Sequence, residues 1–566
     1  CNCFGFWKMT NLQRLKNYFL IFIVFFTVLG SSYVFISTVY ELQFTNSDYF
    51  KNQALSYRVK TEKLKASRGN IYDKNLLILS SSSRSYNIGI FPSKIDNLDE
   101  VVNSLSAILF LDKELLHKRI ISTPNFFYLD RNIDYERGEE IKSWNLEGVV
   151  LEPSFDRIIH TNSVSKIIGK VDPDENGIEG LELYFDSSLK GIDGEIRYEA
   201  SPNGKIIPQA PINTTQPTHG KDLVLTLDSE LQFISENLCS EALEKTKALN
   251  CSIVFANANT GEILIAAEKS GYLEDSLNID LLSIRAQYEP GSSLKIFSIG
   301  AGIEQGLFDE NTKYLVDDKI EIIEGSCAKN YDGLKGCYKD FLKHDPYEIS
   351  IKEIIERSSN VGTILATKDL DINYLEDYLH KFGFGERTGV ELTGEIKGGF
   401  TEYNICKTCL SSLSIGYSVN VTQLQMVKAY SIIANGGKNI NLSLIKKPTE
   451  SSNLQQVISV EMSERLRNLL INVVEGVNGT GKSLKLDNYV IGGKTGTSRT
   501  HIEGDGYSDF RFNTSFTGFI ETLEGPVVGS VILWGASVNP ASEYVTGGST
   551  AAPIFKTIVS NLVPGE

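Results

Sequence analysis

The sequence predicts an α+β protein of more than one domain that begins with a single transmembrane helix. Two observations lead to this prediction. An uncharged stretch of 23 residues lies near the N-terminus, at 18–40. In the C-terminal part, strand-like segments at 253–266 and 514–533 enclose a region with helical patterns, which predicts a sheet covered by helices. At 566 residues the chain is also longer than one domain usually is.

The uncharged stretch is long enough to cross a membrane, because a hydrocarbon core of about 30 Å needs roughly 20 helical residues. Lys8, Arg14 and Lys16 precede it, and no acidic residue does. By the positive-inside rule, residues 1–17 lie in the cytoplasm and the rest of the chain lies outside it. A cleaved signal peptide and a buried helix of a soluble protein are the alternatives, and the length and the basic flank favour the membrane helix.

Residues 41–216 are expected to fold as a mixed domain without catalytic groups. Its expected elements are strands at 86–90 and 148–151 and helices at 101–108 and 113–121. Arg68 and Asp73 are expected to form a structural ion pair.

The polar run 213–220 is the expected linker to a second domain at 217–566. Asp228 or Ser229 is expected to cap the first helix of that domain. Its other expected elements are strands at 223–227, 253–256, 262–266, 514–520 and 527–533 and helices at 229–249 and 554–562.

Ser292 and Lys295 carry the first chemical signal. They follow a Pro290-Gly291 turn and open an apolar run that predicts a buried helix. Residues three apart share a helical face, so the lysine points back at the serine. A lysine whose pKa is lowered by burial can take the proton of a serine nucleophile.

Alone, this Ser-x-x-Lys pattern is weak, because it recurs at Ser163, Ser187 and Ser443 without a preceding Pro-Gly turn. Two later stretches strengthen it. Ser358-Ser359-Asn360 supplies a Ser-x-Asn, and Lys494-Thr495-Gly496-Thr497 supplies a Lys-Thr-Gly. The three motifs occur in the order typical of penicillin-binding proteins and serine β-lactamases.

On these motifs the chain resembles a class B penicillin-binding protein, most like the septal peptidoglycan D,D-transpeptidase of cell division. Two departures, Leu76 and Ser418, stand where the family usually has glycine and concern loop shape. The resemblance extends over nearly the whole chain through Arg68–Asp73, Gly177–Glu182, Leu225–Asp228, Phe382–Gly385, Ser414–Tyr417, Gly547–Gly548 and Ala552–Phe555.

The resemblance implies a dimerisation-type pedestal at 41–216 and a serine β-lactamase-like transpeptidase domain at 217–566. It implies that Ser292 attacks the carbonyl between the two terminal D-alanines of a stem peptide while Lys295 takes its proton. Ser358 is then implied to pass a proton to the leaving D-alanine. The other motif residues are implied to bind substrate: Asn360 the acyl chain, and Lys494, Thr495, Gly496 and Thr497 the terminal carboxylate, with the backbone N–H groups of Ser292 and Thr497 as oxyanion hole.

Stem peptides and β-lactams are the ligands that the resemblance implies, with no cofactor. It places the chain in the bacterial inner membrane with the catalytic domain periplasmic. The implied partners of region 41–216 are membrane proteins of the division machinery and a glycosyltransferase. A net charge of −16 argues against nucleic acid as a partner, and the six scattered histidines lack a zinc-binding spacing.

Three other functions stay open at this point: an elongation-type transpeptidase, a membrane-anchored β-lactamase or β-lactam sensor, and a silent division scaffold. A class A β-lactamase needs a glutamate that activates water. No motif assigns that role between the second and third motifs. The candidates fit helix surfaces or the Phe-Gly-Phe-Gly region: Glu376, Glu386, Glu391, Glu395 and Glu402.

Six of the eight cysteines lie beyond the transmembrane stretch, where disulfides are permitted, and the first four form two pairs with different expectations. Cys239 and Cys251 fall in or beside a predicted helix and are expected to be plain core residues. Cys327 and Cys337 are separated by nine residues in a loop-like stretch and are expected to lie close enough to pair.

Two further cysteine pairs are short-range. Cys406-x-x-Cys409 is a local disulfide or two thiols, because no thioredoxin-like βαβ context surrounds it. Cys1 and Cys3 fall on the cytoplasmic side and are expected to be reduced. Met9 is a second candidate for the natural start of the chain.

Overall fold

The computed structural model describes residues 11–201, 207, 212–271, 280–328, 335–401, 406–446, 454–502, 506–537 and 545–563. The chain forms two compact units. The first consists of residues 1–66 and 192–219, and the second of residues 67–191 and 220–566. Cys1, Cys3, Lys8, Met9 and Glu402 lie outside the described residues.

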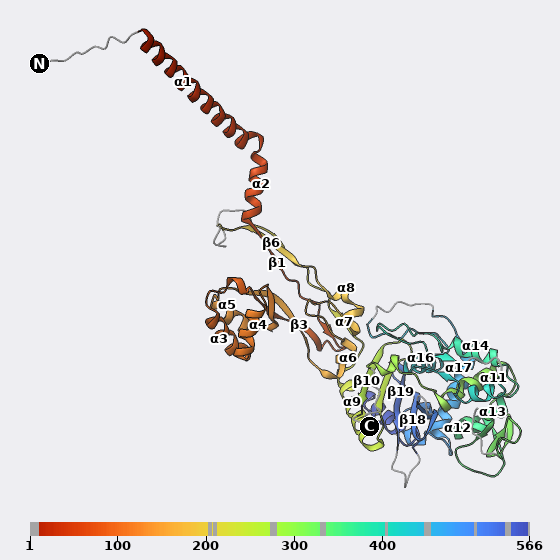
Figure 1. The fold of residues 1–566 in the computed structure, drawn as a ribbon. Helices are drawn as coiled ribbons and strands as arrows, with labels where there is room; N and C mark the ends of the chain where they lie inside the picture. The colour runs from red at the N-terminus through yellow and green to blue at the C-terminus, as the bar shows by residue number, and fades with distance from the viewer. Residues whose placement is uncertain are drawn as a thin grey trace. The chain divides into compact units, whose positions relative to one another are not determined.

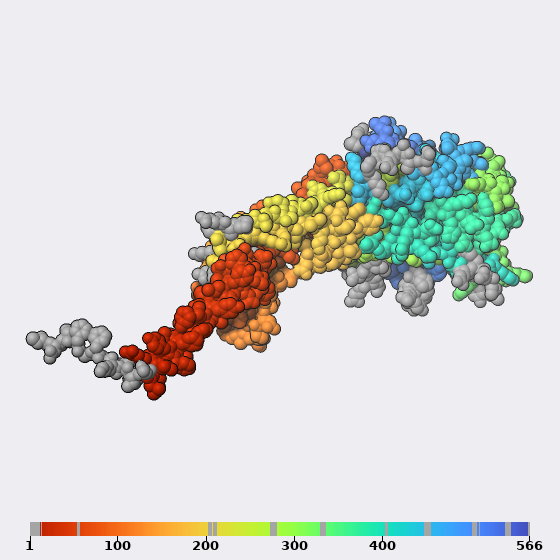
Figure 2. Space-filling model, turned by 90° about the horizontal axis from the view of Figure 1, so that it is seen from above, coloured from red at the N-terminus to blue at the C-terminus, as the bar shows by residue number. Residues whose placement is uncertain are grey.

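Helix α1 of the first unit spans Asn11–Tyr40 and carries no charge after Lys16. Its apolar side chains are exposed along the helix, which Figure 2 draws in red. Among the described residues it is the one helix with the length and composition to cross a membrane. The Thr27 and Ser31 hydroxyls donate to carbonyls one turn earlier, at 2.8 Å each, so these polar groups are satisfied without water.

The rest of the first unit is a short helix and a small sheet. Antiparallel pairing joins its strands in the order β1-β6-β7. The elements are a π turn at Glu41–Thr45, α2 at Ser47–Arg58, β1 at Val59–Leu64, β6 at Gly194–Glu199 and β7 at Asn213–Thr215.

The second unit opens with a sheet in the order β4-β3-β2-β8, in which β5 also pairs with β3. Helices α3 to α5 pack their apolar residues on β3 to β5 in a separate hydrophobic cluster. The strands predicted at 86–90 and 148–151 and the helices predicted at 101–108 and 113–121 are confirmed, whereas the strand predicted at 223–227 is shorter and ends at Val224. Their bounds are β2 Ile71–Tyr72, β3 Ile78–Ile90, α3 Leu98–Leu109, α4 Lys113–Ser122, β4 Phe127–Asp134, α5 Tyr135–Ser143, β5 Val149–Ile159 and β8 Leu223–Val224.

The expected ion pair between Arg68 and Asp73 is wrong. The buried guanidinium of Arg68 binds Glu182 at 2.8 Å and Asp186 at 2.7 Å, which joins two of the stretches that carry the family resemblance. Asp73 accepts hydrogen bonds from the Leu77 N–H and the Ser229 hydroxyl, both at 2.8 Å. A buried arginine needs buried carboxylates, and tertiary folding supplied closer ones than Asp73.

The second five-stranded sheet of this unit is antiparallel throughout, with its strands in the order β10-β9-β19-β18-β17; β10, β19 and β18 are labelled in Figure 1. Successive side chains of a strand face opposite sides. Ile253 and Phe255 of β9 therefore pack in the cluster of α9 and α18, whereas Val254 and Ala256 pack in the cluster of α11 and α16. The sheet is covered on both faces, as predicted. The bounds are β9 Asn250–Asn257, β10 Ile263–Ser270, β17 Ile491–Ile502, β18 Gly506–Thr522, β19 Gly525–Ala536, α9 Ser229–Thr246 and α18 Ala551–Leu562.

Short helices and two-stranded sheets fill the remainder of this unit, and Asp228 caps α9 as expected. The helices are α6 Ser165–Ile168, α7 Gly180–Tyr184, α8 Asp186–Leu189, α10 Leu282–Arg285, the 3₁₀ turn η4 Gly291–Leu294, α11 Lys295–Glu304, α12 Ile351–Arg357, α13 Asn360–Thr367, α14 Ile372–Lys381, α15 Cys409–Ser414, α16 Gln423–Ala434 and α17 Val460–Glu475. The strands are β11 Lys313–Val316, β12 Lys319–Glu321, β13 Cys337–Lys339, β14 Tyr347–Ser350, β15 Gly399–Phe400 and β16 Val419–Asn420.

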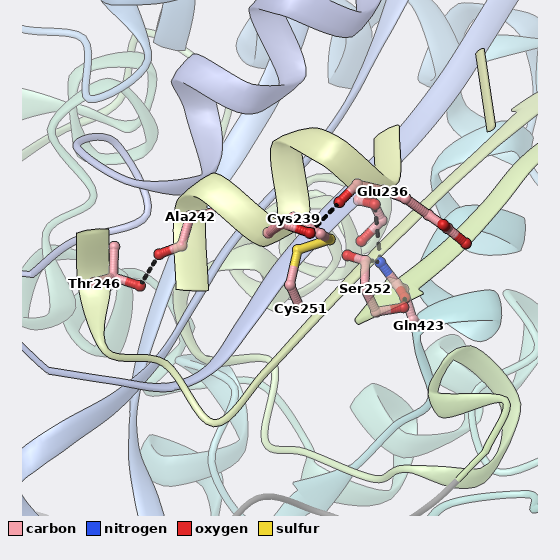
Figure 3. The surroundings of a disulfide bond; sticks show 9 residues. Glu236, Cys239, Ala242, Thr246, Cys251, Ser252 and Gln423 are labelled. Carbon is pink, nitrogen blue, oxygen red and sulfur yellow. Dashed lines mark hydrogen bonds between the residues drawn. A yellow bond between two sulfur atoms is a disulfide. The ribbon is translucent and has the colours of Figure 1, made fainter. Parts of the chain in front are cut away.

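The interpretation of Cys239 and Cys251 as plain core residues is wrong, because they form a disulfide that ties α9 to β9 (Figure 3). Both are fully buried, and a helix packed on its neighbouring strand brings their Cα atoms to 5.5 Å. The expected proximity of Cys327 and Cys337 is confirmed, since they also form a disulfide.

Cys406 and Cys409 form a third disulfide, so the local disulfide is the correct one of the two alternatives weighed for them.

Candidate active site

Ser292 lies in the 3₁₀ turn η4, one turn before α11 begins at Lys295. The sequence placed it in the first turn of an α-helix; a 3₁₀ turn at that position stacks residues three apart directly above one another. Gly291 has a left-handed backbone, with φ of 54°, and its N–H donates to the Gly416 carbonyl at 3.0 Å. These contacts hold the half-buried Ser292 at the start of the buried helix.

Lys295 is fully buried, and its Nζ donates to the Ser358 carbonyl at 2.6 Å and lies 3.5 Å from the Ser358 Oγ. Burial lowers the pKa of Lys295 to about 7, while the negative charge of Asp340 opposes part of that shift. Near neutral pH, a substantial fraction of the amine is therefore uncharged and able to accept a proton.

Ser358 joins two helices and has a left-handed backbone, with φ of 62°. Ser359 caps the second helix, α13, by accepting from the Gly362 N–H at 2.8 Å. Asn360 Nδ2 donates to the Lys339 carbonyl at 2.8 Å. This sharp junction directs Ser358 toward the lysines of the other two motifs.

Lys494 reaches the same hydroxyl from β17: its Nζ donates to Ser358 Oγ at 2.8 Å and to the Thr495 carbonyl at 3.2 Å. Burial lowers the pKa of Lys494 well below its usual value, and the charge of Lys295 lowers it further. The three motifs, separated in the sequence, thus converge on Ser358.

Strand β17 runs close to the turn that carries Ser292. A Cβ placed on Gly496 would lie 2.3 Å from Ser515 Oγ and 3.0 Å from the Pro290 carbonyl oxygen, so only glycine fits there. Thr497 accepts from the Gly547 N–H at 3.2 Å. This packing places the turn that carries Ser292 beside the Gly496–Thr497 segment.

Two more residues outside the motifs, Asp340 and Thr480, bind them through their side chains, and sequence analysis missed both. Asp340 accepts hydrogen bonds from Ser359 Oγ at 2.7 Å and from the Asn360 N–H at 2.5 Å. Thr480 accepts from Thr495 Oγ1 at 2.8 Å. No local pattern marks either residue, although Asp340 follows the paired Cys337 by three positions.

The two departures from the family pattern share one backbone feature. Leu76 and Ser418 both have a left-handed conformation, with φ of 65° and 63°. Glycine adopts this conformation without steric cost, whereas in other residues the Cβ atom makes it sterically unfavourable. The Ser418 N–H donates to Glu289 Oε1 at 2.9 Å, which fixes the turn beside the Ser292 motif.

In the other three Ser-x-x-Lys stretches, the lysine or the serine binds residues outside the three motifs. Lys166 binds Glu268 at 3.1 Å and Asp280 at 3.0 Å, and Lys190 binds Asn176. The Ser443 hydroxyl donates to Glu391 at 2.8 Å. Only the stretch at Ser292 joins the other two motifs among the described residues.

Comparisons with known proteins match both parts of the chain. Residues 251–560 match the family model of the penicillin binding protein transpeptidase domain, and residues 63–225 match that of the penicillin-binding protein dimerisation domain. The probable peptidoglycan D,D-transpeptidase PenA of Neisseria gonorrhoeae is 26% identical over 97% of this chain and 92% of its own. Stage V sporulation protein D of Bacillus subtilis is 28% identical over 88% of this chain and 78% of its own.

Solved structures show the same fold. The crystal structure of penicillin binding protein 3 from Mycobacterium tuberculosis, complexed with aztreonam, superposes with a TM-score of 0.64 at 24% identity and covers 88% of this chain and 96% of that one. The chain belongs to the class B penicillin-binding proteins, which combine a dimerisation domain with a transpeptidase domain. Within this family it is a peptidoglycan D,D-transpeptidase.

Proposed function

We propose that this transpeptidase cross-links stem peptides through an acyl-enzyme on Ser292 during septal wall synthesis. One observation carries the assignment of residues: two buried lysines, Lys295 and Lys494, meet at Ser358 Oγ, while β17 packs against the turn of Ser292. Such an arrangement suits a serine nucleophile, a neutral lysine base and a proton relay.

In the proposed first step, the Ser292 Oγ attacks the carbonyl carbon of the penultimate D-alanine, and Lys295 takes the hydroxyl proton. The backbone N–H groups of Ser292 and Thr497 stabilise the oxyanion. The C–N bond breaks, and a proton that passes through Ser358 reaches the leaving D-alanine. The amine of a second stem peptide then attacks the ester and restores Ser292, with Asn360 holding the acyl chain.

Lys494, Thr495 and Thr497 are proposed to bind the terminal carboxylate of the stem peptide. A carboxylate beside Lys494 favours the charged amine, so substrate binding raises the pKa that burial lowers in the free protein. Gly496 lets the strand approach the substrate closely.

A transpeptidase must protect its acyl-enzyme from water, and among the described residues three of the five glutamates considered for a β-lactamase have other partners. Glu391 accepts from Ser443 Oγ at 2.8 Å, and Glu395 from Thr388 Oγ1 at 2.6 Å. Glu376 lies 3.8 Å from His380, and Glu386 is exposed. These contacts support a long-lived acyl-enzyme.

The domains are proposed as a cytoplasmic tail at 1–17, a membrane anchor at 18–40, a pedestal at 41–216 and a catalytic domain at 217–566. Helix α1, the one described helix with the length and composition of a membrane span, is consistent with an inner-membrane anchor. The three disulfides beyond it suit an oxidising periplasm. The pedestal carries no catalytic motif, so we propose that it binds division-machinery membrane proteins and a glycosyltransferase.

Intact-protein mass spectrometry after one dose of benzylpenicillin tests the reaction. We expect a Ser292 adduct that persists for hours, and none in Ser292→Ala. Loss of the adduct within seconds with accumulation of hydrolysed penicillin would identify a β-lactamase. Depletion in cells tests the septal role: filaments support it, and rounded cells would indicate elongation.

A further inference from the structure

Glu356 is a buried carboxylate two residues before Ser358, and both hydrogen bonds of its side chain come from one distant segment. Its Oε2 accepts from Asn472 Nδ2 at 2.7 Å, and its Oε1 accepts from the Asn478 N–H at 2.7 Å. Its own carbonyl accepts from the Thr480 N–H at 3.2 Å. Three hydrogen bonds thus attach residues 472–480 to the last turn of α12.

The packing around this carboxylate is close. A Cβ on Gly476 would lie 2.6 Å from Glu356 Oε1, so only glycine lets the segment approach. Buried carboxylates usually pair with a cation, but Glu356 is held here by an amide and a backbone N–H. These hydrogen bonds fix where residues 472–480 lie relative to α12.

The other end of the same segment lies at the third motif. Thr480 accepts a hydrogen bond of 2.8 Å from Thr495 Oγ1. A Cβ on Gly548 would lie 2.6 Å from the Thr480 carbonyl oxygen, so Thr480 is enclosed on a second side. The position of Thr480 therefore sets the direction of the Thr495 hydroxyl.

We propose that Glu356 is a positioning residue for substrate binding: it holds the segment 472–480 so that Thr480 stays beside Thr495. Thr480 accepts the Thr495 proton in the free protein; when the stem peptide binds, Thr480 donates to Thr495 Oγ1 instead, and the Thr495 hydroxyl donates to the terminal carboxylate. Glu356 touches neither substrate nor reacting atoms and acts through Thr480. This inference rests on the proposed role of Thr495 as a carboxylate ligand.

Two variants of Glu356 differ in the hydrogen bonds that they keep with residues 472–480. Glu356→Ala leaves Asn472 Nδ2 and the Asn478 N–H without their acceptor, so the segment loses its anchor. In Glu356→Gln, the amide oxygen accepts from Asn478, and its NH₂ donates to Asn472 once that side-chain amide turns over. The glutamine variant should therefore restore the position of Thr480.

The experiment compares two D-alanyl thioesters on the full chain in detergent, one ending in a carboxylate and the other in a carboxamide. In acylation, the Ser292 Oγ–C bond forms, the C–S bond breaks and a thiol is released, which is measured with a chromogenic thiol reagent. The readout is the ratio of kcat/KM for the two thioesters. This ratio does not depend on the fraction of folded enzyme.

We expect the ratio to fall about tenfold in Glu356→Ala and in Thr480→Val. In the double variant, the ratio should be no lower than in either single variant. Glu356→Gln should keep the ratio within about twofold of wild type. Glu395→Ala is the matched control: it removes a buried carboxylate that binds Thr388, and its ratio should equal that of wild type.

An unchanged ratio in Glu356→Ala, with the wild-type preference for the carboxylate intact, would overturn the inference and leave the proposed function standing. If Glu356→Ala does not fold, Asn472→Ala removes one of the two donors, and an unchanged ratio there would overturn the inference equally. If the wild-type enzyme shows no preference for the thioester that ends in a carboxylate, neither Thr495 nor Glu356 has the proposed role.

Discussion

The Oδ1 atom of Asp340 accepts a hydrogen bond of 2.5 Å from the backbone N–H of Asn360, twenty residues further along the chain. Asp340 thereby caps the helix that begins at the second motif, and the negative charge also acts on the buried Lys295. It follows β13, whose first residue, Cys337, is held by a disulfide. A loop without a recognisable motif thus shapes both the geometry and the protonation of the site.

The first prediction concerns the pH dependence of acylation. In the proposed mechanism only the neutral amine of Lys295 accepts the Ser292 proton, and burial lowers the pKa of Lys295 to about 7. The acylation rate should therefore be low below pH 6 and rise through a midpoint near pH 7, as measured by stopped-flow with benzylpenicillin. Lys295→Ala should reduce the rate about 10²–10⁴-fold, the usual contribution of a general base. A rate independent of pH between 5 and 9 would contradict this role.

The second prediction concerns Asp340→Asn. The charge of Asp340 raises the pKa of Lys295 against the effect of burial, so its removal should lower that pKa and move the midpoint of the acylation profile to lower pH. Asp345→Asn is the control, because Asp345 is exposed and contacts His344 through its carbonyl. A midpoint that stays in place or rises in Asp340→Asn would refute the electrostatic role.

The third prediction concerns the disulfide between Cys327 and Cys337, which closes the loop that leads to Asp340. Replacing both cysteines with alanine should destabilise this loop by roughly 2–3 kcal/mol through added freedom of the unfolded chain. Because Asp340 then loses its anchor, the acylation rate should fall as well. Alanine at Cys239 and Cys251 is the control: it should lower the midpoint of thermal unfolding but leave the acylation rate of folded protein near wild type.

The fourth prediction concerns Leu76, which is 66% exposed in a left-handed conformation with φ of 65°. Leu76→Gly should remove about 1–2 kcal/mol of steric cost and add up to about 1 kcal/mol of unfolded-state entropy. The midpoint of thermal unfolding should therefore stay equal or rise. The neighbouring Leu77 is also exposed but has no left-handed backbone, so Leu77→Gly should lower the midpoint. The reverse order of the two variants would disprove the strain at Leu76.

Much of this protein could be predicted from local patterns. An uncharged run long enough to span a bilayer indicated α1, and alternating or periodic apolar residues indicated β9, β10, β18, β19 and α18. The three short motifs indicated the family and proposed the site, since acyl transfer by a serine needs its lysine at a fixed spacing on one helical face. These features depend on residues close together in the chain, so the sequence by itself determined them.

Tertiary structure alone decided which distant groups meet. The pairing of Cys239 with Cys251 follows from the packing of α9 on β9, and the partners of Arg68 are carboxylates more than a hundred residues away. The same holds for Asp340, Glu356 and Thr480 around the motifs. Their spacing from their partners follows no period of helix or strand, because it is set by how elements pack, and packing depends on the whole chain at once.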